Sequence, residues 1–523
     1  MKLEILDSTL RDGSQAEGIS FSVQDKINIV KALDAFGIDY IEAGNPGSNP
    51  KDLQFFEQVR GLQLRHAKLC AFGSTRRYSV AADEDANLQS ILQANTPAVS
   101  IFGKSWDLHV TEILGITLPQ NLEIVEDTLR YLKEKGKEVI FDAEHFFDGY
   151  KANAPYALDV LAAAAAGGAD CLCLCDTNGG CLPGEISEIT TAVARRFPGI
   201  KLGIHCHDDI GCAVANTLSA VLAGAVHVQG TFVGFGERCG NADLSVVLPN
   251  LVFKCGMDYH ADLRQLTATA TYLSEVSNVR LRGNKPYTGK SAFAHKGGMH
   301  IDGVIKLSRS FEHIGPESVG NARKFLTSEV AGKSSILPKI QEFLPELHKN
   351  SPETAAIIAL LKDKECVGYQ YEAAQASFEL LVKKQLGLWR PHFDVVFFKT
   401  GGDYALGDSS LRETAIIQIN VNGETEVAGA VGNGPVNALD KALRTALGRF
   451  YPEITRMHLA DYKVRIIDSA STTAAKTRVL IDSTDGTEVW TTIGVSEDIV
   501  EASFIALIDS FEYLLSRLGR SNK

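Results

Sequence analysis

The strongest constraint on the fold is an alternation that runs from residue 3 to about residue 257. Short apolar segments of strand length are each followed by a polar turn and an amphipathic helical pattern, and the unit recurs eight times. Strands that alternate with helices predict a parallel sheet, because a crossover must return the chain between parallel strands. The predicted strands are Leu3–Leu6, Tyr40–Ala43, Lys68–Phe72, Ala98–Phe102, Glu138–Phe141, Cys171–Leu174, Lys201–Ile204 and Val226–Val233.

Eight such units fit either a closed barrel or an open doubly wound sheet, and the position of the polar residues favours the barrel. These residues follow the strands at their carboxyl ends. They are Arg11, Asp12, Glu42, Glu144, Asp176, Thr177, His205, His207 and the segment 237–241. A barrel brings all of these strand ends to one face, where its active sites lie. The sequence therefore predicts a (β/α)₈ TIM barrel over residues 1–257.

Two further regions follow the barrel pattern. Residues 258–391 lose the strand pattern and are predicted to form helical linker subdomains. Residues 392–523 contain an internal repeat, in which Val431-Gly432 recurs as Ile493-Gly494, and predict a C-terminal α+β domain of two βββα copies. Pro435 is placed in the first turn of one helix and Ser496 at the N-cap of the other. Two copies form a small core, so association with a second chain is expected.

Composition narrows the classes of partner. The chain has 52 Lys and Arg against 64 Asp and Glu, a net charge of −12, which disfavours nucleic acid and anionic lipid as partners. Its apolar runs fall far short of the roughly 20 residues that span a bilayer. The ten cysteines include no Cys-x-x-Cys pair. We therefore expect a cytoplasmic protein with reduced thiols and no targeting segment.

Two histidines lie two residues apart at the end of the seventh predicted strand, in the segment Leu202-Gly-Ile-His205-Cys-His207. Alternate residues of a strand face the same way, about 6.6–6.8 Å apart at the backbone, so both imidazoles can reach one cation. Hydrogen-bonded core histidines would show the same spacing. The expected presence of Asp12 at the same mouth favours a catalytic metal site with open positions. Ligands of this kind suit Mn²⁺, Mg²⁺, Zn²⁺ or Fe²⁺.

Two other strand ends carry candidate catalytic residues. Arg11 adjoins Asp12, where it can stabilise an oxyanion on a metal-bound carbonyl, although a salt bridge would use the same pair. Glu144 is a strand-end carboxylate for which an acid–base or water-orienting role is expected, with Asp142 and His145 as nearby alternatives.

Two motifs have less specific interpretations. The segment Cys171-Leu-Cys173-Leu-Cys175 alternates thiols with leucines, which predicts a strand with one small apolar face rather than a thiolate cluster. The segment Gly234-Phe-Gly236-Glu-Arg-Cys-Gly240-Asn241 lacks the spacing of a dinucleotide-binding fold. After the eighth strand it could either admit a phosphate-bearing cofactor or form a tight turn.

The motifs after the first and in the seventh strand resemble two signatures of the 2-isopropylmalate/homocitrate/citramalate synthase family. They read Asp7-Ser-Thr-Leu-Arg11-Asp12-Gly13 and His205-Cys-His207-Asp-Asp-Ile-Gly211. The connector and the C-terminal region match too, so the resemblance covers nearly the whole chain. The segments Phe102-Gly-Lys-Ser-Trp106 and Asp142-Ala-Glu-His-Phe-Phe-Asp-Gly-Tyr150 resemble the long-form (R)-citramalate synthases more closely than the isopropylmalate enzymes.

This resemblance implies an acyltransferase that condenses acetyl-CoA with pyruvate and water to (R)-citramalate and CoA, in the biosynthesis of isoleucine. The alternative acceptor is 2-oxoisovalerate, which would make the chain a 2-isopropylmalate synthase of leucine biosynthesis. The resemblance also implies that Asp12, His205 and His207 hold Mn²⁺ or Mg²⁺, with Zn²⁺ as a further choice. Asn241 would be a direct or water-mediated ligand.

Roles for four other residues follow from the same resemblance. Arg11 and Thr177 would bind the 2-oxo acid, and Glu144 would assist acid–base chemistry. His300 matches a linker histidine that the partner subunit of a homodimer inserts into the active site, and it is our candidate for the base. The family usually carries a Tyr where this chain has Phe311, so no catalytic role passes to residue 311.

The C-terminal repeat resembles the family's regulatory domain, which binds the end-product amino acid. Gly432, Gly434, Gly494 and Ser496 precede helices whose free N–H groups could hold a carboxylate, and isoleucine is the implied inhibitor. Other classes stay open: a non-haem iron oxygenase would share the ligand set, and a related lyase would run the C–C bond in reverse. A catalytically inactive amino-acid sensor is the alternative outside the enzymes.

Overall fold

The computed structural model describes residues 2–326 and 337–521, apart from gaps at 338–339, 342–343, 349–350, 372, 403–412, 468–474 and 487. The chain forms two compact units. One comprises Met1–Phe293 with Glu312–Arg323, and the other Ala294–Phe311 with Lys324–Lys523. The domain boundaries predicted at 257/258 and 391/392 stay predictions. No helix among the described residues combines the length and apolarity needed to cross a membrane.

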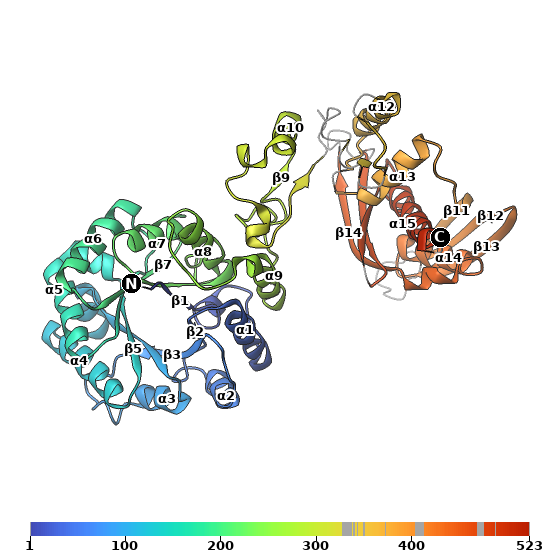
Figure 1. The fold of residues 1–523 in the computed structure, drawn as a ribbon. Helices are drawn as coiled ribbons and strands as arrows, with labels where there is room; N and C mark the ends of the chain where they lie inside the picture. Colours follow the sequence, from blue (N-terminus) through green and yellow to red (C-terminus); the bar gives the residue numbers. More distant parts are fainter. Residues whose placement is uncertain are drawn as a thin grey trace. The chain divides into compact units, whose positions relative to one another are not determined.

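The first unit is a closed barrel of eight parallel strands in sequential order (Figure 1). The strands are β1 Glu4–Asp7, β2 Tyr40–Glu42, β3 Lys68–Ser74, β4 Ala98–Lys104, β5 Glu138–Glu144, β6 Cys171–Asp176, β7 Lys201–Cys206 and β8 His227–Gly230. Strand β1 pairs with β2 on one side and with β8 on the other, which closes the sheet. The predicted TIM barrel is confirmed.

Helices surround the barrel and pack their apolar side chains against the outer faces of the strands. They are α1 Val23–Phe36, α2 Pro50–Gln58, α3 Ala86–Ala94, α4 Leu118–Glu134, α5 Phe146–Ala166, α6 Pro183–Arg196, α7 Ala213–Leu222, α8 Leu244–Phe253 and α9 Leu266–Val276. Helix α1 begins with a capping box in which Ser22 and Asp25 satisfy each other's backbone N–H groups. It buries Ile29, Val30 and Leu33, which is the apolar stripe that its sequence predicts.

The interior of the barrel contains an apolar layer rich in thiols. Cys171, Cys173 and Cys175 of β6 pack there with five other buried side chains, which are Leu6, Tyr40, Cys70, Ala98 and Ile140. Burial raises the pKa of the Cys171 and Cys173 thiols well above the usual value, so these groups stay protonated. The alternating cysteines are packing residues, as the sequence predicts.

Several strands are longer at their carboxyl ends than the sequence predicts. Strand β5 continues to Glu144 and β6 to Asp176, since polar residues there still pair within the sheet. Strand β8 is shorter than the predicted Val226–Val233, because the backbone leaves the sheet after Gly230 and Val233 adopts a φ of 67°. Strands therefore hold some of the polar side chains at the mouth, whereas others, such as those of Arg11 and Asp12, lie in the turns that follow the strands.

The second unit begins with helical and extended segments and ends with two similar sheets (Figure 1). Strand β9 Ala294–His295 pairs with β10 Lys324–Phe325, and α10 Gly298–Lys306 lies between them in the sequence. Helices α12 Pro352–Cys366 and α13 Gln375–Gln385 follow.

The predicted βββα repeat is confirmed. The first copy contains β11 Asp394–Gly402, β12 Glu413–Val421, β13 Glu424–Gly432 and α14 Pro435–Gly448. The second contains β14 His458–Ile466, β15 Thr477–Thr484, β16 Val489–Ser496 and α15 Ile499–Ser521. Pro435 occupies the first turn of α14, as predicted. The prediction of Ser496 as N-cap is wrong: α15 begins later, and Asp498 accepts from the N–H groups of Val500 and Glu501.

We predict that Asp34, at the end of α1, anchors the segment before β3. Burial alone would raise the pKa of Asp34, but N–H groups of Ala67, Arg65 and His66 at 2.8–3.0 Å hold it below the usual value. Asp34→Asn should cost about 1–3 kcal/mol of unfolding free energy at pH 7. A lowered pKa stabilises the fold above the unfolded-state pKa of about 3.9, so this difference should shrink below about pH 4.

Urea unfolding at several pH values between 3 and 7 measures this difference in unfolding free energy. Hydrogen exchange of the β3 amides is a second, local measurement of the same effect. The control is Asp83→Asn at an exposed aspartate of the same unit, which should change the unfolding free energy little. An equal difference at pH 3 and pH 7 would contradict the assignment.

Candidate functional site

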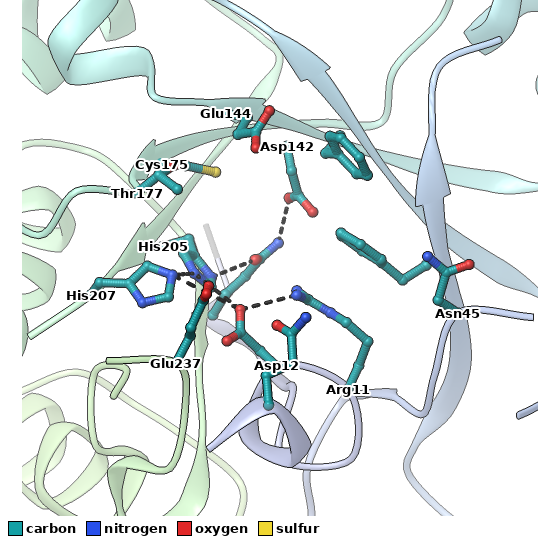
Figure 2. Close-up of a pocket in the computed structure, with 14 residues that line it drawn as sticks. Arg11, Asp12, Asn45, Asp142, Glu144, Cys175, Thr177, His205, His207 and Glu237 are labelled. Carbon is teal, nitrogen blue, oxygen red and sulfur yellow. Dashed lines mark hydrogen bonds and ion pairs between the residues drawn. The ribbon is translucent and has the colours of Figure 1, made fainter. Parts of the chain in front are cut away.

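A cavity of about 340 Å³ opens at the carboxyl end of the barrel (Figure 2). Residues from all eight strands or from the turns after them line it, so one pocket collects side chains that lie far apart in the sequence. They are Arg11, Asp12, Gln15, Asn45, Phe72, Phe102, Asp142, Glu144, Cys175, Thr177, His205, His207, Gln229 and Glu237. Six of these residues are site residues that the sequence or the resemblance indicates.

The predicted cluster of two imidazoles and a carboxylate forms at this mouth. His205 Nε2 lies 3.3 Å from His207 Nε2, and Asp12 Oδ2 lies 3.7 Å and 4.0 Å from these two atoms. The His205 and His207 side chains come from β7 and the turn after it, and Asp12 from the turn after β1. One potential ligand atom of each residue lies within 4.8 Å of the others, and all three residues are buried.

The electrostatics of the cluster keep the three side chains in the form that binds a cation. Burial lowers the pKa of His205, and burial together with His205 lowers that of His207 to about 4. Burial opposes the charged carboxylate of Asp12, but Arg11 and the two histidines hold its pKa well below the usual range. At neutral pH the cluster therefore presents two neutral imidazoles and one carboxylate.

Asn241 reaches this cluster because the glycine-rich loop after β8 is a tight turn. Its Nδ2 donates to Asp12 Oδ1 at 3.0 Å and to the Phe235 carbonyl at 3.1 Å. A Cβ on Gly236 would collide with Asn241 Nδ2, and one on Gly240, which has a φ of 93°, would collide with the Gly234 carbonyl. The glycines thus allow close backbone approach, which favours the tight-turn interpretation of this motif.

These residues fit a divalent metal ion. The Asn241 amide oxygen is buried and has no hydrogen-bond partner among the described residues, and it lies on the amide that binds Asp12. Electron pairs from two neutral imidazoles and a carboxylate converge beside this amide, and a buried cation would satisfy them. The mixed nitrogen and oxygen donors are borderline in hardness, which suits Mn²⁺, Mg²⁺ or Zn²⁺.

Arg11 is a buried cation beside the cluster. Its Nε donates to Glu42 Oε2 at 2.6 Å and its Nη1 to Asp12 Oδ2 at 3.0 Å. The guanidinium carbon lies 3.8 Å from the centroid of the Phe72 ring. Burial disfavours the charge, yet Glu42 and Asp12 raise the pKa of Arg11. Nη2 makes no hydrogen bond within the described part of the chain and can meet a negatively charged ligand.

Another part of the pocket is lined by Glu144 and Thr177. Lys104 at the end of β4 forms an ion pair with Glu144. Thr177 Oγ1 accepts a hydrogen bond from the His145 N–H at 2.9 Å, which leaves its hydroxyl proton available to a ligand. His145 has a φ of 56°, a conformation that turns the chain sharply out of β5.

The remaining predicted site residues lie in the second unit. His300 is exposed on α10, and its ring packs on Phe311 with centroids 4.7 Å apart. Gly432 ends β13 and Gly494 lies two residues before the end of β16, and a Cβ on either would collide with the backbone of the following helix. Gly434 precedes α14 and has open space around it.

Among the residues that sequence reasoning missed are Gln229 and Phe72, which line the pocket, and Lys104, which pairs with Glu144. Each of these residues lies inside a predicted strand or just beyond its predicted end. A single polar or aromatic residue at such a position does not form a motif that would identify it as a site residue. Gln229 alternates with His227 along β8, and both are almost fully buried. Two polar residues at alternate buried positions of a barrel strand are a signal that could have identified it.

Comparisons with known proteins cover the whole architecture. The model described as HMGL-like matches residues 2–273, that of the homocitrate synthase post-HMGL domain-like family matches 287–365, and that of the LeuA allosteric (dimerisation) domain matches 372–515. The chain is 51% identical over 518 residues to the (R)-citramalate synthase of Aquifex aeolicus, covering 99% of this chain and 98% of that protein. The chain belongs to the (R)-citramalate synthase family.

Other relatives agree with this assignment. The (R)-citramalate synthase of Synechocystis sp. is 50% identical over 531 residues, covering 99% of this chain and 96% of that protein. A probable 2-isopropylmalate synthase of Methanopyrus kandleri is 30% identical over 519 residues, covering 99% of both chains. The family resemblance inferred from the motifs is confirmed.

We predict that Gly236 is needed to hold Asn241 against Asp12. Gly236→Ala should push the Asn241 amide away and weaken Mn²⁺ binding by about 10-fold or more, the size of effect typical of lost support around a metal ligand. Titration calorimetry of the folded variant measures the affinity.

The matched control is Gly256→Ala. Gly256 has a φ of 69° with open space around it, so the change costs about 1–2 kcal/mol of stability without touching the cluster. Its Mn²⁺ affinity should equal that of the wild type. Unchanged affinity in Gly236→Ala would mean that the loop does not position Asn241 for the metal.

Proposed function

We propose that this chain condenses acetyl-CoA with pyruvate and water to form (R)-citramalate and CoA. The observation that carries the chemistry is the convergence of Arg11 with the Asp12, His205 and His207 cluster at the barrel mouth. The substrates come from the names of relatives that are 44–51% identical over nearly the full length of both chains. In this proposal residues 1–257 form the catalytic domain and residues 258–391 form the linker subdomains. Residues 392–523 form the domain that regulates the enzyme and holds the dimer together.

The proposed cofactor is Mn²⁺ or Mg²⁺, held by Asp12, His205 and His207, with Asn241 bound directly or through water. When bound, the ion acts as a Lewis acid that polarises the carbonyl of a 2-oxo acid. Arg11 places a positive charge beside this position and meets the negative charge that develops on the ketone oxygen. The Thr177 hydroxyl donates to the carboxylate of the 2-oxo acid.

The proton transfers fall to His300 and Glu144 in this proposal. The His300 imidazole takes a proton from the acetyl methyl group, and the resulting carbon nucleophile forms a C–C bond with the ketone carbon of pyruvate. The oxygen of that ketone becomes the hydroxyl of the product. Water then cleaves the thioester, CoA leaves, and Glu144 orients the reacting groups beside Lys104.

The aromatic wall of the pocket favours a small acceptor. The Phe72 and Phe102 rings both line the cavity and stack with centroids 5.3 Å apart and planes at 19°. In this proposal the two rings face the alkyl group of the acceptor, and they favour the methyl group of pyruvate over the isopropyl group of 2-oxoisovalerate. The discrimination to be expected from one missing or added methylene is about 1–3 kcal/mol, so pyruvate is the proposed acceptor and 2-oxoisovalerate the alternative.

We also propose a homodimer in which each chain supplies His300 to its partner. Helix α10 and the turn after it expose apolar side chains next to His300, and Met299 is 87% exposed. The others are Ile305, Leu307 and Phe311. A run of exposed apolar residues of this kind marks an interaction surface. The match to a dimerisation domain also supports a dimer.

Isoleucine is the proposed inhibitor, with its carboxylate at a helix N-terminus of the repeat domain. The start of α14 suits this better than that of α15. No side chain caps α14, and Gly434 leaves space there. At α15 the Asp498 carboxylate already occupies the N–H groups, and Ser496 is engaged with Glu501. Of the four predicted effector residues, Gly434 therefore has the strongest physical basis, and Gly432 and Gly494 act in packing.

The proposed function predicts the acceptor profile. Release of CoA from acetyl-CoA in the presence of Mn²⁺ should be fast with pyruvate and at least about 10-fold slower with 2-oxobutyrate, 2-oxoisovalerate or 2-oxoglutarate. Isoleucine should suppress release, while valine and leucine should act weakly. Preference for 2-oxoisovalerate would move the enzyme to the leucine pathway. No release with any acceptor would favour the amino-acid sensor.

Mixed dimers test whether His300 acts in the partner subunit. Glu144→Gln and His300→Ala should each lower kcat by about 10²–10⁴-fold in homodimers. Equal mixing of the two variants under subunit exchange should restore about a quarter of the wild-type activity, because half of the dimers carry one intact site. No recovery in demonstrably mixed dimers would show that His300 acts within its own chain.

A further inference from the structure

A hydrogen-bonded series of four buried side chains, called the relay below, leads from the barrel interior to His205 of the candidate metal site. Ser100 Oγ of β4 donates to Asp142 Oδ2 of β5 at 2.5 Å, and Gln229 Nε2 of β8 donates to Asp142 Oδ1 at 2.8 Å. Gln229 Oε1 lies 3.1 Å from His205 Nδ1 (Figure 2). All four side chains are at most 6% exposed, so water does not compete for these bonds.

The carboxylate end of this chain fixes the direction of every hydrogen bond in it. Both oxygens of Asp142 accept, so the amide group of Gln229 must turn its NH₂ toward Asp142. Its carbonyl oxygen then faces His205 and can only accept. The proton of the neutral His205 ring must therefore lie on Nδ1, and the Nε2 electron pair faces Asp12 and His207.

The second histidine has no such support at Nδ1. His207 Nδ1 is buried and lacks a hydrogen-bond partner among the residues that the structure describes. No acceptor in the described part of the chain therefore holds the proton of His207 on Nδ1, and its Nε2 lies 3.3 Å from His205 Nε2. Both histidines lie near the end of β7 and belong to the same candidate metal site. Only His205 has an acceptor at Nδ1 that leaves the electron pair of Nε2 available to a cation.

We propose that Gln229, oriented by Asp142, is a positioning residue that holds His205 in the Nδ1–H tautomer and thereby sets the affinity for the divalent ion. Without this acceptor the ring can carry its proton on Nε2, where it blocks the ligand position. His205 is then in the tautomer that binds a cation before the ion arrives, whereas His207 takes its tautomer when the ion binds. This inference rests on the metal site of the proposed function.

The first experiment compares Mn²⁺ affinity, measured by calorimetry and by the electron paramagnetic resonance signal of free Mn²⁺. Gln229→Met keeps the shape of the side chain but removes its acceptor, and should weaken binding by about 10–100-fold. Gln229→Glu keeps an oxygen toward His205 and can share a proton with Asp142, so it should stay within a few-fold of the wild type. Gln63→Met makes the same change at an exposed residue of the barrel unit outside the pocket, and should leave affinity unchanged.

The second experiment reads the tautomer directly. In metal-free protein labelled with ¹⁵N-histidine, the His205 ring nitrogens should show the Nδ1–H form in the wild type and a shift toward Nε2–H in Gln229→Met. Comparison with a His205→Asn spectrum assigns the signals. This measurement in the wild type does not depend on whether any Gln229 variant folds.

The outcomes separate the inference from the function on which it rests. A folded Gln229→Met variant that binds Mn²⁺ as tightly as the wild type overturns the inference, as does a wild-type His205 protonated on Nε2. Loss of affinity in Gln229→Glu equal to that in Gln229→Met also overturns it, because the acceptor would then not matter. A wild type that binds no divalent ion would instead overturn the proposed metal chemistry.

Discussion

Closure of the barrel is the constraint on which every distance in the candidate site depends. Pairing of β1 with β8 brings the first and last strands together, and Asn241 thereby reaches Asp12 at 3.0 Å across 229 positions of the sequence. The same closure places Gln229 of β8 against both His205 of β7 and Asp142 of β5. Paired strands carry Asp142, His205 and Gln229, and the turns that follow β1 and β8 carry Asp12 and Asn241, so the strands and these turns together fix the geometry of the site.

The charges at the mouth explain why the pocket fits a cation. Two buried carboxylates, Glu42 and Asp12, are both bound to one guanidinium, that of Arg11, and Asp142 adds a third acid within the same interior. Burial and the neighbouring Glu42 raise the pKa of Asp142, which shows that the interior resists further negative charge. In the proposed function, a divalent ion against Asp12 would offset this negative charge.

Much of this could be predicted from the sequence, and the missing parts have physical causes. Strand periodicity placed His205 and His207 on one face, and the barrel topology brought Asp12 to them. Gln229 could not be inferred, because its role depends on partners from other strands that no local pattern encodes. The cap of α15 was misassigned since Ser496 and Asp498 both carry suitable acceptors, and only the backbone path decides that Asp498 is the one beside the free N–H groups.

The division of the chain into two units separates the two halves of the proposed chemistry. The proposed ligands, Arg11 and Glu144 belong to the barrel unit, on strands and on the turns that follow them. His300 is exposed on α10, which belongs to the same unit as the open N-terminus of α14. In the proposed function, an effector bound to this second unit acts on the unit that carries the base and not on the unit that holds Asp12, His205, His207 and Gln229. Inhibition of this kind would lower turnover and leave the affinity for the divalent ion unchanged.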